Sequence, residues 1–158
     1  EGRFQQFKSD LGINSIVDYA HTPDALMNVL KTIADIRTGN EKVICVLGCG
    51  GDRDVGKRPL MAQFACQLSD QVILTSDNPR SEDPKKIINE MKAGLNASQI
   101  RKVFSLEDRR EAIKLGVTLC SEGDILLVAG KGHEKYQEIN GEPFPFDDMA
   151  ILKEHFKH

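Results

Sequence analysis

Apolar positions alternate along the chain between short continuous runs and longer stretches with helical spacing. A continuous run predicts a strand buried on both faces, and apolar residues three or four positions apart predict an amphipathic helix. Strands are expected at residues 13–20, 42–47, 71–75 and 124–129. Helices are expected at residues 23–37, 58–68, 84–95, 106–120 and 147–156. Strands and helices therefore alternate along most of the sequence.

Turn-forming residues mark several of the boundaries between these elements. Pro23 suits the first turn of the first helix, and Gly39–Asn40 suits its end. Asp147 is the predicted N-cap of the last helix. Asn140–Gly141 is typical of a hairpin turn, so residues 136–139 are expected to form an edge strand beside it.

The alternation of strands and helices predicts an α/β fold, and 158 residues is the length of one domain. We expect a Rossmann-like three-layer domain with a mainly parallel sheet of about six strands, over residues 1–158. Such sheets bind ligands outside the carboxyl ends of their strands. The loops at those ends are residues 18–23, 48–58, 76–84 and 130–134. These loops are also the stretches richest in Gly, Asp, Arg, Lys and His.

The composition excludes several classes of protein. A formal net charge of −3 argues against nucleic-acid binding through bulk positive charge. No apolar run approaches the roughly 20 residues that span a membrane. The four cysteines form no CxxC pair and have no histidine at zinc-finger spacing, so reduced thiols in a cytoplasmic protein are expected. The first residue is Glu1 and not Met, and we expect the chain to be part of a longer protein.

The loop GCGGDRDVGKRP, residues 48–59, is close to two phosphate-binding patterns without matching either. Arg53 stands where the dinucleotide pattern GxGxxG has its third glycine, and Arg58 replaces the hydroxyl residue of the P-loop pattern GxxxxGK[ST]. The loop could still offer backbone N–H groups and guanidinium groups to an anion. The alternative is a solvated turn before a helix.

The loop TSDNPRSEDP, residues 75–84, contains a second candidate group. The Arg80 guanidinium is a rigid bidentate donor that suits a carboxylate. The alternative is an ordinary connection between strand and helix, with Ser81 or Asp83 as the N-cap.

The remaining two loops carry charged residues after buried strands. In AGKGHEKYQ, Glu134 could accept from an ammonium group and Lys131 could meet a phosphate, whereas a lone His133 is more often structural. In DYAHTPDAL, Asp18 ends a strand, where a carboxylate commonly binds a ribose hydroxyl. No nucleophile with His and acid partners at motif spacing is present, and no carboxylate pair is placed for glycoside chemistry.

Five motifs in order along the chain closely resemble the C-terminal domain of the Mur ligases. They are GRF, DYAHTPDAL, GCGGDRDxGKRPxM, TSDNPRSEDP and GDxLLVAGKGHExYQ. The resemblance extends from Gly2 to Asp148. Within the family it is strongest to the members that add meso-diaminopimelate to UDP-N-acetylmuramoyl-L-Ala-D-Glu in peptidoglycan biosynthesis.

The resemblance implies a three-domain enzyme that forms an amide bond through an acyl phosphate. ATP phosphorylates a substrate carboxylate, and the amine of the incoming amino acid then displaces phosphate. The central domain would supply the P-loop, the Mg²⁺ ligands and a carbamylated lysine, so ATP and Mg²⁺ are bound mainly outside this chain. We therefore expect no catalytic or metal-binding residue here and an inactive isolated domain. The expected partners are the UDP-N-acetylmuramoyl dipeptide, meso-diaminopimelate and the other two domains of the same monomeric polypeptide, with no nucleic acid or membrane.

The resemblance also implies two sets of binding residues. The residues expected at the nucleotide are Arg3, Asp18 and His21. Those expected at meso-diaminopimelate are Arg53, Asp77, Asn78, Pro79, Arg80, Gly130 and Glu134. Arg80 and Asn78 would bind the distal carboxylate, while Glu134 and the Gly130 carbonyl would accept from the distal ammonium. Lysine would leave Arg80 without a carboxylate in a partly closed site, which favours meso-diaminopimelate.

Three other functions are compatible with parts of the sequence. A ligase of the same family could add lysine or another amino acid and would be indifferent to Arg80. A stand-alone amino-acid-binding module would catalyse nothing. A nicotinamide oxidoreductase is suggested only by the fold class, and the failed GxGxxG pattern argues against it.

Overall fold

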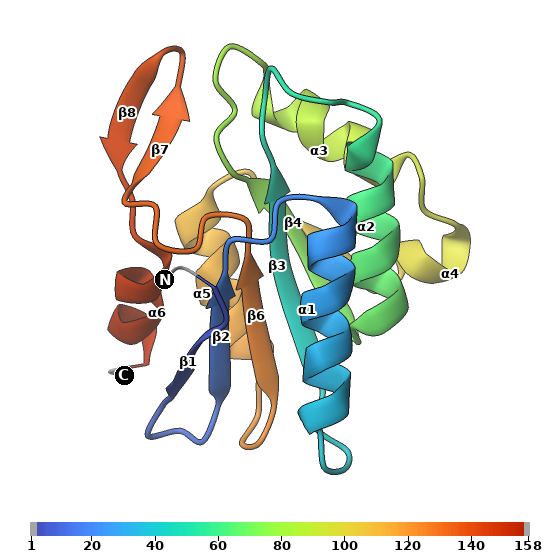
Figure 1. Ribbon diagram of the computed structural model, residues 1–158, viewed down its shortest axis with the longest axis vertical. Coiled ribbons are helices and arrows are strands. Elements are labelled where there is room, and N and C mark those ends of the chain that lie inside the picture. Colours follow the sequence, from blue (N-terminus) through green and yellow to red (C-terminus); the bar gives the residue numbers. More distant parts are fainter. Residues whose placement is uncertain (1–2, 157–158) are drawn as a thin grey trace.

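The computed structural model describes residues 3–156, and a six-stranded sheet forms its centre (Figure 1). In sheet order, the strands are β1 (Gln5–Lys8), β2 (Asn14–Asp18), β6 (Ile125–Ala129), β3 (Val43–Cys49), β4 (Gln71–Ser76) and β5 (Val103–Ser105). Within residues 3–156, β1 is the only strand of this sheet that runs antiparallel to its neighbour. The expected mainly parallel sheet of about six strands is therefore confirmed.

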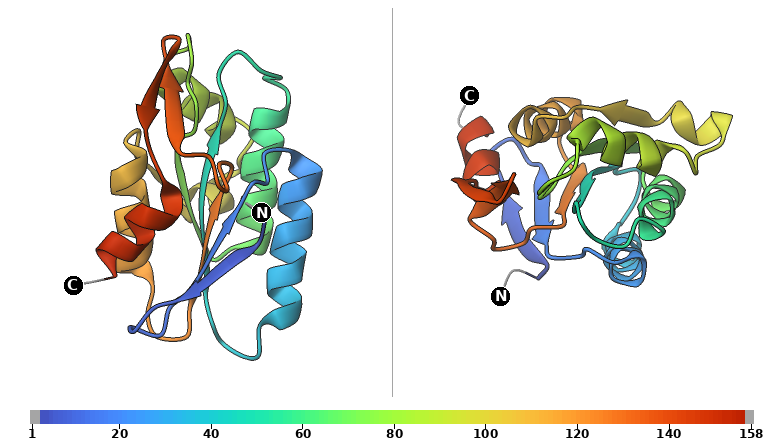
Figure 2. Two further views of the ribbon diagram at one scale, coloured as in Figure 1. Left: turned by 60° about the vertical axis from the view of Figure 1, so that its left-hand side comes forward. Right: turned by 90° about the horizontal axis from the view of Figure 1, so that it is seen from above.

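Helices cover both faces of this sheet and complete the three-layer α/β fold. They are α1 (Pro23–Ile36), α2 (Lys57–Leu68), α3 (Pro84–Lys92), α4 (Ala97–Ile100), α5 (Arg109–Leu119) and α6 (Asp148–His155). Figure 2 shows α1 and α2 on one face and α5 on the other. Buried residues of α1, α2 and α3 join one apolar cluster, and those of α5 and α6 join a second cluster across the sheet.

Polar side chains cap the first turn of several helices. Thr22 caps α1 by accepting from Ala25 N, and Asp147 caps α6 as predicted. The helix predicted from residue 106 begins instead at Arg109, because the Asp108 side chain accepts from the amides of the first turn. The apolar periodicity alone did not locate this start, since Leu106 continues the pattern before the cap.

The residues predicted as an edge strand form one arm of a separate hairpin. Strands β7 (Tyr136–Ile139) and β8 (Glu142–Pro145) pair with each other and not with the main sheet. Asn140 and Gly141 connect them with φ angles of 52° and 80°, as the predicted turn requires. The hairpin extends beyond the carboxyl end of the main sheet, beside the loop between β4 and α3 (Figure 1).

The cysteines occupy sheltered positions and carry free thiols. Cys45, Cys49 and Cys66 are buried, and Cys120 is half-buried. Burial raises the pKa of Cys45, Cys49 and Cys120 to about 12, so their thiols stay protonated near neutral pH. Within residues 3–156, no group of three or more His, Cys, Asp or Glu side chains is placed to hold a metal ion. No helix in this part of the chain is long and apolar enough to cross a membrane.

Candidate functional site

Four loops surround one hollow of about 160 Å³ at the carboxyl end of the sheet. Strands β2, β6, β3 and β4 are parallel and adjacent, so the loops that follow them lie together. The hollow is lined by Tyr19, His21, Gly50, Arg53, Lys57, Asp77, Asn78, Arg80, Gly130 and Glu134. The predicted meeting of the four loops is confirmed.

Seven of the ten predicted site residues line this hollow. They are His21, Arg53, Asp77, Asn78, Arg80, Gly130 and Glu134. Pro79 is buried beneath the neighbouring loop, and Asp18 and Arg3 lie outside the lining. Sequence reasoning missed Tyr19, Gly50 and Lys57 as lining residues. Only their position in the sequence could have identified them, because all three belong to, or directly follow, loops at the carboxyl ends of strands.

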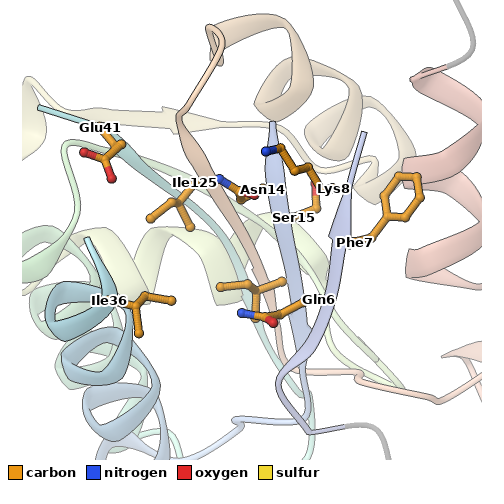
Figure 3. Close-up of a pocket in the computed structure, with 9 residues that line it drawn as sticks. Gln6, Phe7, Lys8, Asn14, Ser15, Ile36, Glu41 and Ile125 are labelled. Atoms are coloured by element: carbon orange, nitrogen blue, oxygen red, sulfur yellow. The ribbon is translucent and has the colours of Figure 1, made fainter. Parts of the chain in front are cut away.

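A larger hollow of about 290 Å³ lies at the opposite end of the sheet (Figure 3). It opens near the amino ends of β2 and β6. Its lining residues are Gln6, Phe7, Lys8, Asn14, Ser15, Ile16, Ile36, Glu41 and Ile125. None of the predicted site residues is among them, and only Lys8 and Glu41 carry charge. The smaller hollow is therefore the better candidate for a specific polar ligand.

The charges around the candidate site have both signs. Arg53, Lys57 and Arg80 bring three cations to it, and Asp77 and Glu134 bring two carboxylates. Burial raises the pKa of Glu134, and its Lys131 neighbour opposes that shift. A small hollow with several opposite charges suits a ligand that carries both ammonium and carboxylate groups.

Lys131 lies under the site as a fully buried cation. Its Nζ atom donates to Asn78 Oδ1 at 2.7 Å and to Tyr136 O at 2.9 Å, and lies 3.0 Å from Asp77 Oδ1. A buried ammonium needs such partners to offset its lost hydration. The expectation that Lys131 could meet a phosphate is therefore wrong, because its donors are occupied inside the protein.

The glycine-rich loop packs directly against the loop that carries Arg80. A Cβ atom on Gly48 would lie 2.7 Å from Asp77 N, and a Cβ atom on Gly51 would overlap the Pro79 carbonyl. The Gly51 amide donates to Asn78 O at 2.8 Å. The two backbones can approach this closely only because these positions lack side chains.

Several other groups of this loop bond within the protein and are therefore not free to contact an anion. The Asp52 amide donates to Glu82 Oε1 at 3.1 Å. Arg58, where a P-loop has Ser or Thr, is fully buried and forms ion pairs with Glu82 at 2.9 Å and Glu90 at 2.8 Å. It also donates to Gly50 O at 3.0 Å. The arginine thus fixes the loop from inside and offers no group to a ligand.

Arg80 occupies an unusual backbone conformation, with φ at 52°. A residue with a side chain is strained in this region, and such strain is concentrated at functional sites. Arg80 Nη1 donates to Gly51 O at 3.0 Å, and Arg80 Nε lies 3.3 Å from Glu138 Oε1. Its guanidinium is therefore fixed at the edge of the hollow.

The three residues predicted at the nucleotide differ in accessibility. Arg3 and His21 are exposed, and His21 Nδ1 donates to Tyr19 O at 2.9 Å. Asp18 is only 6% exposed, and its two oxygens accept from Phe4 N at 2.6 Å and Ala20 N at 2.8 Å. Asp18 therefore joins the backbone that follows Arg3 to the loop that carries His21.

Lys57 connects two of the loops. Its Nζ atom donates to His21 O at 2.7 Å. This hydrogen bond connects the start of α2 to the loop after β2. In the fold, this lysine lines the hollow as its third cation.

The sequence matches the family described as "Mur ligase, glutamate ligase domain" over residues 2–132. It is 60% identical over 153 residues to the UDP-N-acetylmuramoyl-L-alanyl-D-glutamate--2,6-diaminopimelate ligase of Cytophaga hutchinsonii, covering 97% of this chain and 31% of that protein. The ligase of the same name from Bacteroides thetaiotaomicron is 56% identical, with 98% and 32% covered. A solved structure of a ligase of this name is 48% identical with a TM-score of 0.91, covering 99% of this chain and 31% of that one. The chain thus spans about a third of the length of these relatives.

Proposed function

The chain belongs to the Mur ligase family, and from this premise we propose that it is the amino-acid-binding C-terminal domain of a longer ligase. The full protein adds meso-diaminopimelate to UDP-N-acetylmuramoyl-L-Ala-D-Glu in peptidoglycan biosynthesis. This reaction consumes ATP. This domain binds the incoming amino acid and closes over the nucleotide. Its closure excludes water, which would otherwise hydrolyse the acyl phosphate intermediate.

The mixed charges of the hollow are the observation that carries this proposal. Meso-diaminopimelate has an ammonium and a carboxylate at each end, whereas lysine has no distal carboxylate. Arg80 and Asn78 bind the distal carboxylate, and Glu134 with the Gly130 carbonyl accepts from the distal ammonium. Arg53 meets the same amino acid from the opposite loop, while Asp77 and Pro79 shape the loop that carries Arg80.

The nucleotide is proposed to lie beside Arg3 and His21, with Asp18 holding the two segments together. We propose that the Mg²⁺ ligands lie in the rest of the protein, since no group of three or more His, Cys, Asp or Glu side chains within residues 3–156 is placed to hold a metal ion. The groups that activate the substrate carboxylate are also proposed to lie in the rest of the protein. The isolated domain is therefore proposed to be inactive.

The decisive test is phosphate release by the full-length protein. ATP and UDP-N-acetylmuramoyl-L-Ala-D-Glu are supplied with either meso-diaminopimelate or L-lysine. Release with meso-diaminopimelate alone is expected. Release with lysine would agree with the family but contradict the assignment of Arg80 and Asn78 to the distal carboxylate. Release with neither amino acid would favour a module that only binds amino acids.

Acidification is expected to weaken binding of meso-diaminopimelate through Glu134. Burial raises the pKa of this carboxyl, so it takes up a proton at a higher pH than an exposed glutamate does. A neutral carboxyl loses its charge-assisted bond to the ammonium, so KM should rise about tenfold as the pH falls through that pKa. KM measured against pH for the full-length protein and its Glu134→Gln variant checks this. An identical acidic limb in the variant would contradict the prediction, because glutamine does not titrate.

A further inference from the structure

One residue of the β7–β8 hairpin contacts both side chains assigned to the distal carboxylate. The Glu138 amide donates to Asn78 Oδ1 at 2.9 Å, and the Glu138 carbonyl accepts from Arg80 N at 3.0 Å. Its carboxylate reaches Arg80 Nε at 3.3 Å. Glu138 therefore meets the loop between β4 and α3 through all three of its polar groups, from outside the hollow.

These contacts fix which end of the Asn78 amide faces the ligand. Asn78 Oδ1 accepts from both Lys131 Nζ and Glu138 N, so its oxygen is directed away from the hollow. The NH₂ group is left for the hollow, which Asn78 and Glu134 both line. Asn78 is thereby held as a donor, which suits a carboxylate and not an ammonium.

The hairpin also holds Arg80 in its strained backbone conformation. Arg80 N donates to Glu138 O, and Asn140 N donates to Arg80 O at 2.7 Å, so Arg80 is bound on both sides by β7 and its turn. Glu138 occupies the Nε side of the guanidinium, and Gly51 O takes one hydrogen of Nη1. Among the described residues, Nη2 has no hydrogen-bond partner, which leaves the outer edge of the guanidinium for a carboxylate.

We propose that Glu138 is a positioning residue for substrate selection, which turns the outer edge of Arg80 toward the distal carboxylate of the amino acid. The inference rests on the proposed function, since it concerns the same hollow and the same ligand. Glu138 touches no reacting atom. It acts through Arg80, so its loss should affect recognition of the distal carboxylate and leave the chemical step unchanged.

The test compares three variants of the full-length protein. Glu138→Ala removes the carboxylate, Glu138→Gln keeps an acceptor without charge, and Glu142→Gln is the matched control. Glu142 lies on β8 of the same hairpin, is exposed, and makes no side-chain hydrogen bond or ion pair within residues 3–156. The readouts are kcat and KM with meso-diaminopimelate, together with kcat/KM for L-lysine.

Glu138→Ala is expected to raise KM for meso-diaminopimelate about fivefold, the upper range for a partly exposed ion pair, with kcat and the lysine value unchanged. Glu138→Gln should restore part of the loss, and Glu142→Gln should match the unaltered protein. An unchanged KM in Glu138→Ala, or an equal loss with lysine, would overturn the inference.

A crystal structure of the Glu138→Ala protein decides the geometry independently of activity. The Arg80 guanidinium should lose its single orientation, while the fold and the Asn78 amide keep theirs. An Arg80 side chain in its present position would overturn the inference. If the unaltered protein releases no phosphate with meso-diaminopimelate, the proposed function fails, and this structure still decides whether Glu138 positions Arg80.

Discussion

Replacing Arg80 by alanine is expected to remove most of the selectivity for meso-diaminopimelate over L-lysine in the full-length protein. The change deletes a bidentate bond to the distal carboxylate, a loss of about 3 kcal/mol. The ratio of kcat/KM between the two amino acids should therefore fall about 100-fold. Most of the change should appear with meso-diaminopimelate, because lysine makes no bond to this guanidinium.

Two further substitutions separate the side chain from the backbone at this position. Arg80→Gly also removes the guanidinium but adopts the 52° φ angle without strain, so the same loss of selectivity in both variants assigns the effect to the side chain. Arg80→Lys keeps the charge without the planar fork and should lose selectivity by an intermediate amount.

The matched control is Arg101→Ala, because Arg101 is an exposed arginine at the end of α4, outside the candidate site. The kcat/KM values for both amino acids are measured in every variant. A selectivity ratio in Arg80→Ala equal to that of the control would refute the assignment of the distal carboxylate to this loop.

The position of Arg80 could be predicted from the sequence, but its orientation could not. A buried strand followed by a polar loop places a residue at the carboxyl edge of a parallel sheet, and no further information is needed. The orientation depends on Glu138, which lies 58 positions later and meets Arg80 only because a hairpin folds back beside it. No sequence feature near Arg80 or near Glu138 indicates that contact.

Lys131 shows the same limit for a charged residue. A lysine after a glycine at a strand end is compatible with a phosphate contact, and the sequence offers no measure of burial. In the fold its ammonium lies among Asp77, Asn78 and a backbone carbonyl.

The apolar pattern also did not predict the short strands at the two edges of the sheet. Strand β1 is mostly polar and β5 has three residues, so neither produces an apolar run.

Asp148→Ala is expected to destabilise the domain by about 3–5 kcal/mol, because it leaves the Arg109 guanidinium buried without a counter-charge. Both side chains are completely buried, and Arg109 Nε and Nη2 donate to the two Asp148 oxygens at 2.9 and 2.7 Å. Burial alone would lower the pKa of Arg109, but nearby carboxylates, Asp148 first among them, more than offset burial and raise that pKa. Urea unfolding of the 158-residue chain measures the loss.

An exposed pair between the same two helices provides the control. Arg110 and Glu154 connect α5 and α6 at 2.9 Å in solvent, so Glu154→Ala should cost less than about 1 kcal/mol. The double variant Arg109→Met with Asp148→Leu removes both buried charges and should recover much of the lost stability. A loss in Asp148→Ala no larger than in Glu154→Ala would contradict the prediction.

The buried pair also connects stability to the candidate site. Arg109 Nη1 donates to Ser76 O at 3.1 Å and Nη2 to Ala129 O at 3.3 Å, so the guanidinium bridges the carboxyl ends of β4 and β6. The next residues along the chain are Asp77 and Gly130, which line the hollow. Without Asp148, the guanidinium must move toward water and release these two carbonyls. Selectivity for meso-diaminopimelate should therefore fall in the Asp148→Ala protein even at temperatures where it remains folded, and it should not fall in Glu154→Ala.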